Sequence, residues 1–281
     1  SCGDGKGSAH GDRQLKRKLL PIASAEDPRI AAYRDIRERD LVGRQGRFVA
    51  EGRVVLNVLF STGRFTAESV FLRENRVAGL GDLIDRIPEV VPIYTASAAV
   101  MDEVAGFEIH RGILAIGRKR ETSGEALLDT LPDAALVVAL SGISNHDNMG
   151  SIFRNAASFG AAAVLLTNDC CDPLYRKAIR VSVGATLKIP FARFSDTATL
   201  AAALEDQGYS ILALSPQGKI DIAGIKRDPR HALLLGSEGH GLSEEDMRQF
   251  PTARIAMAPD FDSLNVAAAS AIALHRLWRP A

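Results

Sequence analysis

Cysteine is scarce in this chain, and its positions exclude the usual cysteine-based sites. Only Cys2, Cys170 and Cys171 occur among 281 residues. Adjacent cysteines rarely form a structural disulfide, and no spacing typical of a zinc site is present. We therefore expect no metal and a reduced, cytoplasmic compartment.

Long apolar runs and a surplus of charge are also missing. No apolar stretch approaches the ~20 residues of a membrane-spanning helix, and the polar, glycine-rich start shows no secretory signal. We expect no membrane partner. The 34 basic and 34 acidic residues give a net charge of zero. This balance counts mildly against nucleic acid, although a local basic face can still bind RNA.

The first half of the chain divides into three parts by composition. Residues 1–12 are rich in glycine, serine, aspartate and histidine, and positions 13–18 carry four basic residues, so residues 1–27 predict a flexible tail that is either solvated or in contact with RNA. Residues 28–118 predict a smaller α/β domain. Its expected strands are 69–73, 91–94 and 112–117, and its expected helices are 51–59, 81–86 and 96–104. Residues 119–132 are polar and irregular, as in a linker.

Residues 133–281 show a more regular alternation of strands and helices. The expected strands are 135–140, 162–166, 186–191, 209–214, 232–235 and 254–257. The expected helices are 150–159, 174–181, 197–207, 243–249 and 265–278. This alternation predicts a mostly parallel sheet flanked by helices, with ligands bound at the carboxyl ends of the strands.

The loop after residues 135–140 carries an asparagine and an arginine. Asn148 stands where a helix N-cap is expected, and Arg154 follows six residues later. Ile152, Ala156 and Phe159 fit the apolar stripe of that helix. Arg154 is therefore either a plain surface residue or one that points along the edge of a cleft.

The loop after residues 232–235 is rich in glycine. Gly236, Gly239 and Gly241 allow a sharp turn and a close backbone approach to a ligand. Glu238 lies between them, and it is either a solvated carboxylate or part of a site. Ser243 with Asp246 resembles a capping box. The loop is neither a Walker motif nor a dinucleotide-binding fingerprint.

The third loop, residues 259–266, contains Ser263, Leu264 and Asn265 and precedes a run of alanines. Taken alone, it indicates only the start of a closely packed helix.

Together and in this order, the three loops carry a specific pattern. Residues 148–154, 235–242 and 263–266 resemble the Asn-x-Gly-x-Ile-x-Arg, Leu-Gly-x-Glu-Gly-x-Gly and Ser-Leu-Asn-Val motifs of the SpoU/TrmH branch of the SPOUT RNA methyltransferases. The stretch 48–118, above all residues 110–115, is similar to the substrate-binding domain often joined to this family. The chain departs from the family pattern at Asn145-His146, where Asp-Pro or Asn-Pro is common, and at Ala256, where proline is common.

The resemblance implies a fold, a cofactor and an assembly. The fold would be a trefoil-knotted, mostly parallel sheet flanked by helices, preceded by a smaller α/β RNA-binding domain. The enzyme would be a homodimer through its C-terminal domain, with the active site near the subunit interface. S-adenosyl-L-methionine would be held largely by backbone groups of Gly236, Ile255 and Leu264, with Met257, Gly239 and Gly241 nearby.

The resemblance also implies transfer of a methyl group to a ribose 2′-hydroxyl of rRNA or tRNA, with Arg154 activating the hydroxyl. Because the pKa of arginine exceeds ~12, electrostatic support of a phosphate or of the forming alkoxide is the alternative role. Asn148 and Glu238 would orient Arg154 and the RNA, while Ser263 and Asn265 would hold the third loop and the substrate edge. The alternatives are a relative that methylates bases, a catalytically silent RNA-binding protein and a general nucleotide-binding α/β protein.

Overall fold

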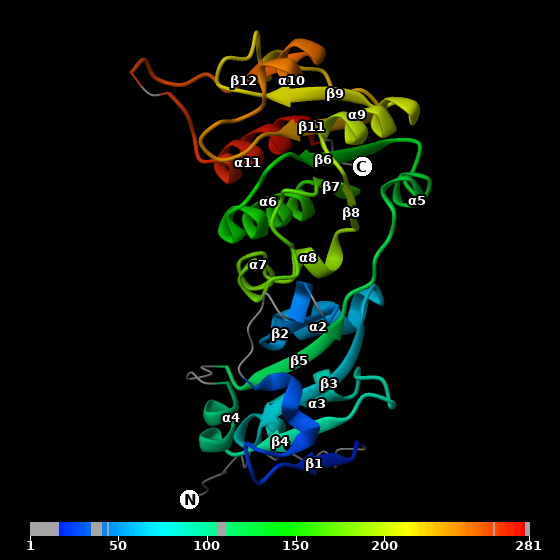
Figure 1. Cartoon of the computed structure of the whole chain (residues 1–281), viewed down its shortest axis with the longest axis vertical. Helices are drawn as coiled ribbons and strands as arrows, with labels where there is room; N and C mark the ends of the chain where they lie inside the picture. Colours follow the sequence, from blue (N-terminus) through cyan, green and yellow to red (C-terminus); the bar gives the residue numbers. More distant parts are fainter. Residues whose placement is uncertain (1–16, 35–40, 44, 106–110, 261, 279–281) are drawn as a thin grey trace, which may run out of the picture.

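The computed structural model describes residues 17–34, 41–43, 45–105, 111–260 and 262–278. Two sheets follow one another along the long axis of the molecule (Figure 1). Their strand orders are β1-β4-β3-β5-β2 and β10-β12-β9-β11-β6-β7-β8. No helix in the described ranges has the length and apolar character needed to cross a membrane.

The first sheet is mixed, because β5 runs antiparallel to β2 and β3 while β1, β3 and β4 are parallel. Its strands are β1 (Leu19–Pro21), β2 (Arg47–Glu51), β3 (Thr66–Arg73), β4 (Ile93–Ala96) and β5 (Ile113–Arg118). Its helical segments are η1 (Pro28–Tyr33), α2 (Arg53–Thr62), η2 (Glu74–Leu80), α3 (Gly81–Ile84) and α4 (Ala98–Ala105). Apolar side chains are buried on both faces of this sheet, with Phe48 and Leu56 on one face and Tyr33 and Phe71 on the other.

The tail expected over residues 1–27 is wrong from residue 17 onward, while residues 1–16 lie outside the described part of the chain. β1 pairs with β4, and Ile22 is buried. Arg17 donates to the carbonyl oxygens of Ile87 and Val91, both at 2.8 Å. A strand of three residues is too short to show alternation, so the sequence pattern did not reveal it.

The second sheet is parallel, since each pair of neighbouring strands in it runs in the same direction. Its strands are β6 (Ala135–Leu140), β7 (Ala163–Thr167), β8 (Phe191–Phe194), β9 (Ser210–Leu214), β10 (Ile220–Asp221), β11 (Arg230–Leu235) and β12 (Thr252–Arg254). Its helical segments are α5 (Gly124–Leu128), α6 (His146–Ser158), α7 (Arg176–Val181), α8 (Ala185–Lys188), α9 (Thr197–Asp206), η3 (Ile222–Gly224), α10 (Glu244–Gln249) and α11 (Val266–Leu277). α6 and α11 contribute to the core on one face, and α5 and α9 contribute to the core on the other. The expected parallel sheet with helices on both faces is confirmed.

Three expectations for residues 119–281 need correction. Residues 186–191 do not form a strand, because Ala185–Lys188 is helical and β8 begins at Phe191. The strand expected at 254–257 is β12, which ends at Arg254. The expected linker 119–132 contains α5, whose Leu127 and Leu128 are buried against the second sheet.

The two sheets share a hydrophobic cluster. Leu174, Ile179 and Leu187 belong to the same buried cluster as Leu56 and Leu59 of α2. α2 packs on α8, and β2 packs on α7. We call the part of the chain around the first sheet the first unit and the part around the second sheet the second unit. Residues of the second unit therefore complete the core of the first.

Candidate active site

A cavity of about 1160 Å³ opens at the carboxyl ends of the central strands of the second sheet. The loops after β6, β9 and β11 and the segment before α11 form its walls. Ten of the eleven expected site residues line it: Asn148, Gly236, Glu238, Gly239, Gly241, Ile255, Met257, Ser263, Leu264 and Asn265. The parallel sheet brings these segments together because all its strands end at one edge.

Asn145, not Asn148, caps α6. The Asn145 side chain accepts from the backbone N–H groups of Asp147 at 2.8 Å and Asn148 at 3.1 Å. The helix therefore begins earlier than expected, and Asn148 lies in its first turn. As a result, the Asn148 side chain is free to face the cavity.

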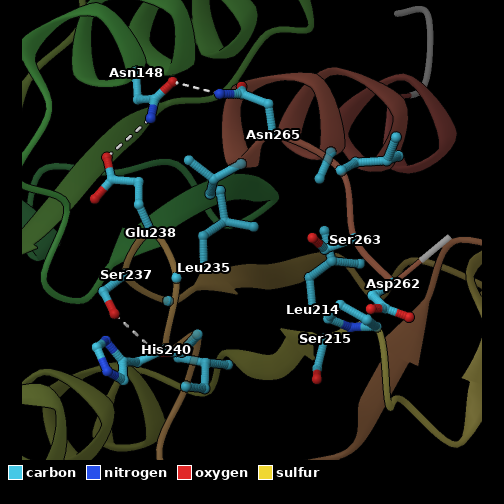
Figure 2. Close-up of a pocket in the computed structure, with 18 of the residues that line it drawn as sticks. Asn148, Leu214, Ser215, Leu235, Ser237, Glu238, His240, Asp262, Ser263 and Asn265 are labelled. Atoms are coloured by element: carbon cyan, nitrogen blue, oxygen red, sulfur yellow. Dashed lines mark hydrogen bonds between the residues drawn. The ribbon is translucent and has the colours of Figure 1, made fainter.

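Asn148 joins the three loops through its amide group. Its Nδ2 donates to Glu238 Oε1 at 3.0 Å, and its Oδ1 accepts from Asn265 Nδ2 at 2.9 Å. Asn265 also caps α11, since its Oδ1 accepts from Ala267 N at 2.9 Å. Figure 2 shows Asn148 between Glu238 and Asn265, with the three side chains turned toward one another. These contacts fix the orientation of both amides.

Glu238 is held as a carboxylate by several donors. Ser144 N lies 3.1 Å from Oε2, and Asn145 N lies 3.3 Å from Oε1. Burial acts to raise the pKa of Glu238, but the hydrogen bonds from Asn148, Ser144 and Asn145 outweigh it and hold the pKa below its ordinary value. An ionised carboxylate with this environment orients its neighbours and is a weak proton acceptor.

The glycine-rich loop folds back on itself at Gly236. A Cβ on Gly236 would lie 2.3 Å from the backbone carbon of Gly241, so only glycine fits there. Gly239 and Gly241 have φ values of +90° and +69°, in the left-handed region. The expected capping box of Ser243 and Asp246 is confirmed at the start of α10.

The opposite wall includes a segment that sequence reasoning missed. Ser215, Pro216 and Gln217 follow β9 and line the cavity, as does Leu214. Figure 2 places Leu214 and Ser215 near Ser263, across the cavity from the hydrogen-bonded side chains of Asn148, Glu238 and Asn265, here called the Asn148 group. A Ser-Pro pair directly after a parallel strand was the available signal.

Arg154 is the one expected site residue that the cavity does not include. Six residues turn a helix by roughly 600°, so Arg154 leaves α6 about 120° away from Asn148. Its side chain is exposed and forms no ion pair within the described residues. The next residue, Asn155, donates to Ala267 O at 2.8 Å and ties the helix to α11.

The cysteines and acidic residues form no metal site in the part of the chain that is described. Cys170 is buried and Cys171 is half-buried, while Cys2 lies outside the described residues. Burial raises the pKa of the Cys171 thiol to about 12. This thiol is therefore a poor nucleophile at neutral pH.

Comparison with known proteins identifies related sequences and folds. The profile of the SpoU rRNA Methylase family matches residues 135–275. An uncharacterized tRNA/rRNA methyltransferase of Mycobacterium tuberculosis is 38% identical over 269 residues, which cover 92% of this chain and 91% of that protein. The 23S rRNA (guanosine-2′-O-)-methyltransferase RlmB of Photobacterium profundum is 30% identical over 198 residues, 67% of this chain and 79% of that protein. The fold matches the AdoMet-bound rRNA methyltransferase of Sinorhizobium meliloti with a TM-score of 0.76 and 24% identity, over 92% of this chain and 97% of that one.

Proposed function

Because the chain belongs to the SpoU rRNA methylase family, we propose that it transfers a methyl group from S-adenosyl-L-methionine to a ribose 2′-hydroxyl of rRNA or tRNA. The single observation that carries this proposal is the junction of the three family motifs at one cavity, through Glu238, Asn148 and Asn265. The relatives named for guanosine 2′-O-methylation support the ribose hydroxyl as the acceptor.

The cavity residues fit this cofactor. Leu235, Ile255, Met257 and Leu264 offer apolar walls to an adenine ring. The close fold at Gly236 leaves backbone amides and carbonyls near the cavity, where no side chain stands in front of them. We assign Gly236, Ile255 and Leu264 as the backbone contacts, with Met257, Gly239 and Gly241 beside them.

The chain's own residues then position the acceptor. When bound, S-adenosyl-L-methionine supplies an activated methyl group, and transfer requires the hydroxyl oxygen in line behind it. Asn148, held by Glu238 and Asn265, offers a fixed polar edge to the ribose. Ser263 and Asn265 hold the third loop against the substrate. Arg154 supports the forming alkoxide or a neighbouring phosphate by its charge.

Arg154 lies outside the cavity of its own chain, so we propose a homodimer in which a second copy brings its Arg154 to the site. Small and apolar residues support such an interface: on α11, Ala268 is exposed and Ile272 is 44% exposed, and Leu264 before the helix is 40% exposed. We also propose that the final segments thread a trefoil knot, as the resemblance implies.

A labelled-methyl assay tests the proposed function. The purified chain should transfer tritiated methyl from S-adenosyl-L-methionine to RNA extracted from cells that lack the protein. Nuclease digestion should then yield 2′-O-methylated nucleosides. Label on a base instead would favour the base-methylating alternative, and binding of RNA without transfer would favour the catalytically silent one.

A further inference from the structure

The loop after β7, residues 168–175, supports the loop that holds Glu238. Cys171 N donates to Ile143 O at 2.8 Å, and Ile143 immediately precedes Ser144 and Asn145, whose N–H groups bind Glu238. The position of Glu238 thus depends on where this loop lies.

Arg193 fixes the start of the same loop from β8. Its guanidinium donates to the carbonyl oxygens of Thr167 at 3.0 Å, Cys170 at 3.1 Å and Cys171 at 3.1 Å. Because one planar guanidinium donates all three hydrogen bonds, the backbone between Thr167 and Cys171 has little freedom to move. Asp172 is the next residue along the chain.

Asp172 ties the loop to the end of the first sheet. Its Oδ2 lies 3.1 Å from Lys119 Nζ, and its Oδ1 accepts from Leu174 N at 2.9 Å. The two side chains are only 18% and 14% exposed, so solvent screens the pair weakly. Lys119 directly follows β5, and its own N–H donates to Gly46 O at 2.7 Å. The ion pair therefore connects the backbone of the first unit with the loop under Glu238.

The residues on either side of Lys119 are exposed cations. Arg118 forms an ion pair with Glu68 through its terminal Nη2, and its side chain is 58% exposed. Arg120 is exposed and forms no ion pair within the described ranges. A phosphate backbone bound by these two arginines would be held by the chain neighbours of Lys119, while the Lys119 side chain stays engaged with Asp172.

We propose that Lys119 and Asp172 form a positioning pair, which couples RNA bound at Arg118 and Arg120 to the loop that holds Glu238. The contacts run from Lys119 to Asp172, from Cys171 to Ile143, and from Ser144 and Asn145 to Glu238. The pair touches neither substrate nor cofactor. It acts on turnover by keeping the Asn148 group in place. The inference rests on the proposed function.

Steady-state kinetics of Lys119→Met and Asp172→Asn test the pair, with RNA from cells lacking the protein as the probe. We expect kcat to fall roughly 10- to 100-fold, because small misplacements near reacting groups cost that much. The KM for RNA and the calorimetric Kd for S-adenosylhomocysteine should stay within about twofold, since neither ligand touches the pair. Asp172→Asn keeps an oxygen for Leu174 N and so guards against unfolding.

Two further variants separate positioning from a general structural effect. Lys119→Arg keeps the charge and should restore most of kcat. Glu121→Gln removes the carboxylate that lies 3.6 Å from Lys119 but is 85% exposed, and should behave as wild type. Unchanged kcat in Lys119→Met, a loss confined to the KM for RNA, or unfolding of both charge-removing variants would overturn the proposal. An inactive wild-type chain would instead overturn the proposed function.

Discussion

Glu238 shows how one side chain can hold several segments of a site together. Its two oxygens receive hydrogen bonds from a side chain of α6 and from two backbone N–H groups before α6. These donors favour the charged form, which is why the pKa of Glu238 is lowered despite its burial. The carboxylate joins the second motif to the first.

The pH dependence of cofactor binding should follow this lowered pKa. A group whose pKa is lower in the folded state stabilises the fold fully above its unfolded pKa of ~4.3, and this contribution is lost as the pH falls through the folded value. We therefore expect binding of S-adenosylhomocysteine to change little through Glu238 between neutral pH and about 4.3.

Glu238→Gln should lower kcat/KM about tenfold, because the charge-assisted acceptor is lost. Calorimetry and initial rates measure both effects.

The exposed Glu245 on α10 offers a matched control. Glu245→Gln changes the same charge outside the cavity and should leave kcat/KM unaltered. Equal losses in the two variants would show that net charge, rather than the bonds to Asn148 and the loop, sets the rate.

The sequence predicted most of the residues that line the cavity, with Arg154 as the exception, but not how their side chains are bonded. Asn145 and Asn148 are both suited to an N-cap, and residue type alone does not decide between them. The choice depends on where β6 ends and how the chain turns into α6. That turn includes Ile143, whose carbonyl oxygen accepts from Cys171 N, a contact between segments that the sequence pattern does not connect.

Among the elements, the end of α7 carries the clearest strain. Val183 has φ +55° and Gly184 has φ +83°. Gly184 N donates to Ile179 O, and Val183 N donates to Arg180 O, as in a Schellman motif. A β-branched residue in the left-handed region is uncommon, because its Cβ crowds the backbone.

Replacing this valine should therefore stabilise the protein. We expect Val183→Gly to raise the free energy of unfolding by about 1 kcal/mol, since the relieved strain exceeds the added entropy of the unfolded chain. Urea unfolding measures the change. Gly184→Ala is the paired control and should destabilise, because a Cβ there would lie 3.2 Å from Val58 Cγ2 of α2 in addition to the unfavourable φ. Destabilisation by Val183→Gly would mean that its side chain makes contacts worth more than the strain.

The same region shows why the apolar pattern of a segment can predict the wrong secondary structure. Residues 186–191 have the apolar character of a buried strand, yet α8 occupies their first half. Leu187 is buried because it faces α2 of the first unit, so the apolar pattern reports a contact with another part of the molecule. β6, in contrast, is buried at all six positions within one sheet, and the sequence placed its bounds correctly.

Across the whole molecule, the order of units was predictable from the sequence, but their joining was not. Composition located a polar stretch at 119–132, but Lys119 pairs with Asp172 and α5 packs on the second sheet. Leu174, Ile179 and Leu187 complete a core that consists mainly of residues from the first unit. Such contacts leave no period in the sequence, because each involves single residues from distant segments.

The proposed dimer leads to a prediction about the activity of the assembled protein. If Arg154 serves the cavity of the second copy, Arg154→Ala and Glu238→Ala chains are each inactive as homodimers. A mixed dimer of the two has one cavity with an intact Glu238 and an intact Arg154 from its partner, while the other cavity lacks both. Two-fold symmetry therefore predicts about half of wild-type activity per mixed dimer. Co-expression with two different affinity tags, tandem purification and the labelled-methyl assay measure it. If Arg154 instead serves its own chain, each cavity of the mixed dimer lacks one of the two residues, and the purified mixed dimer should be as inactive as either parent.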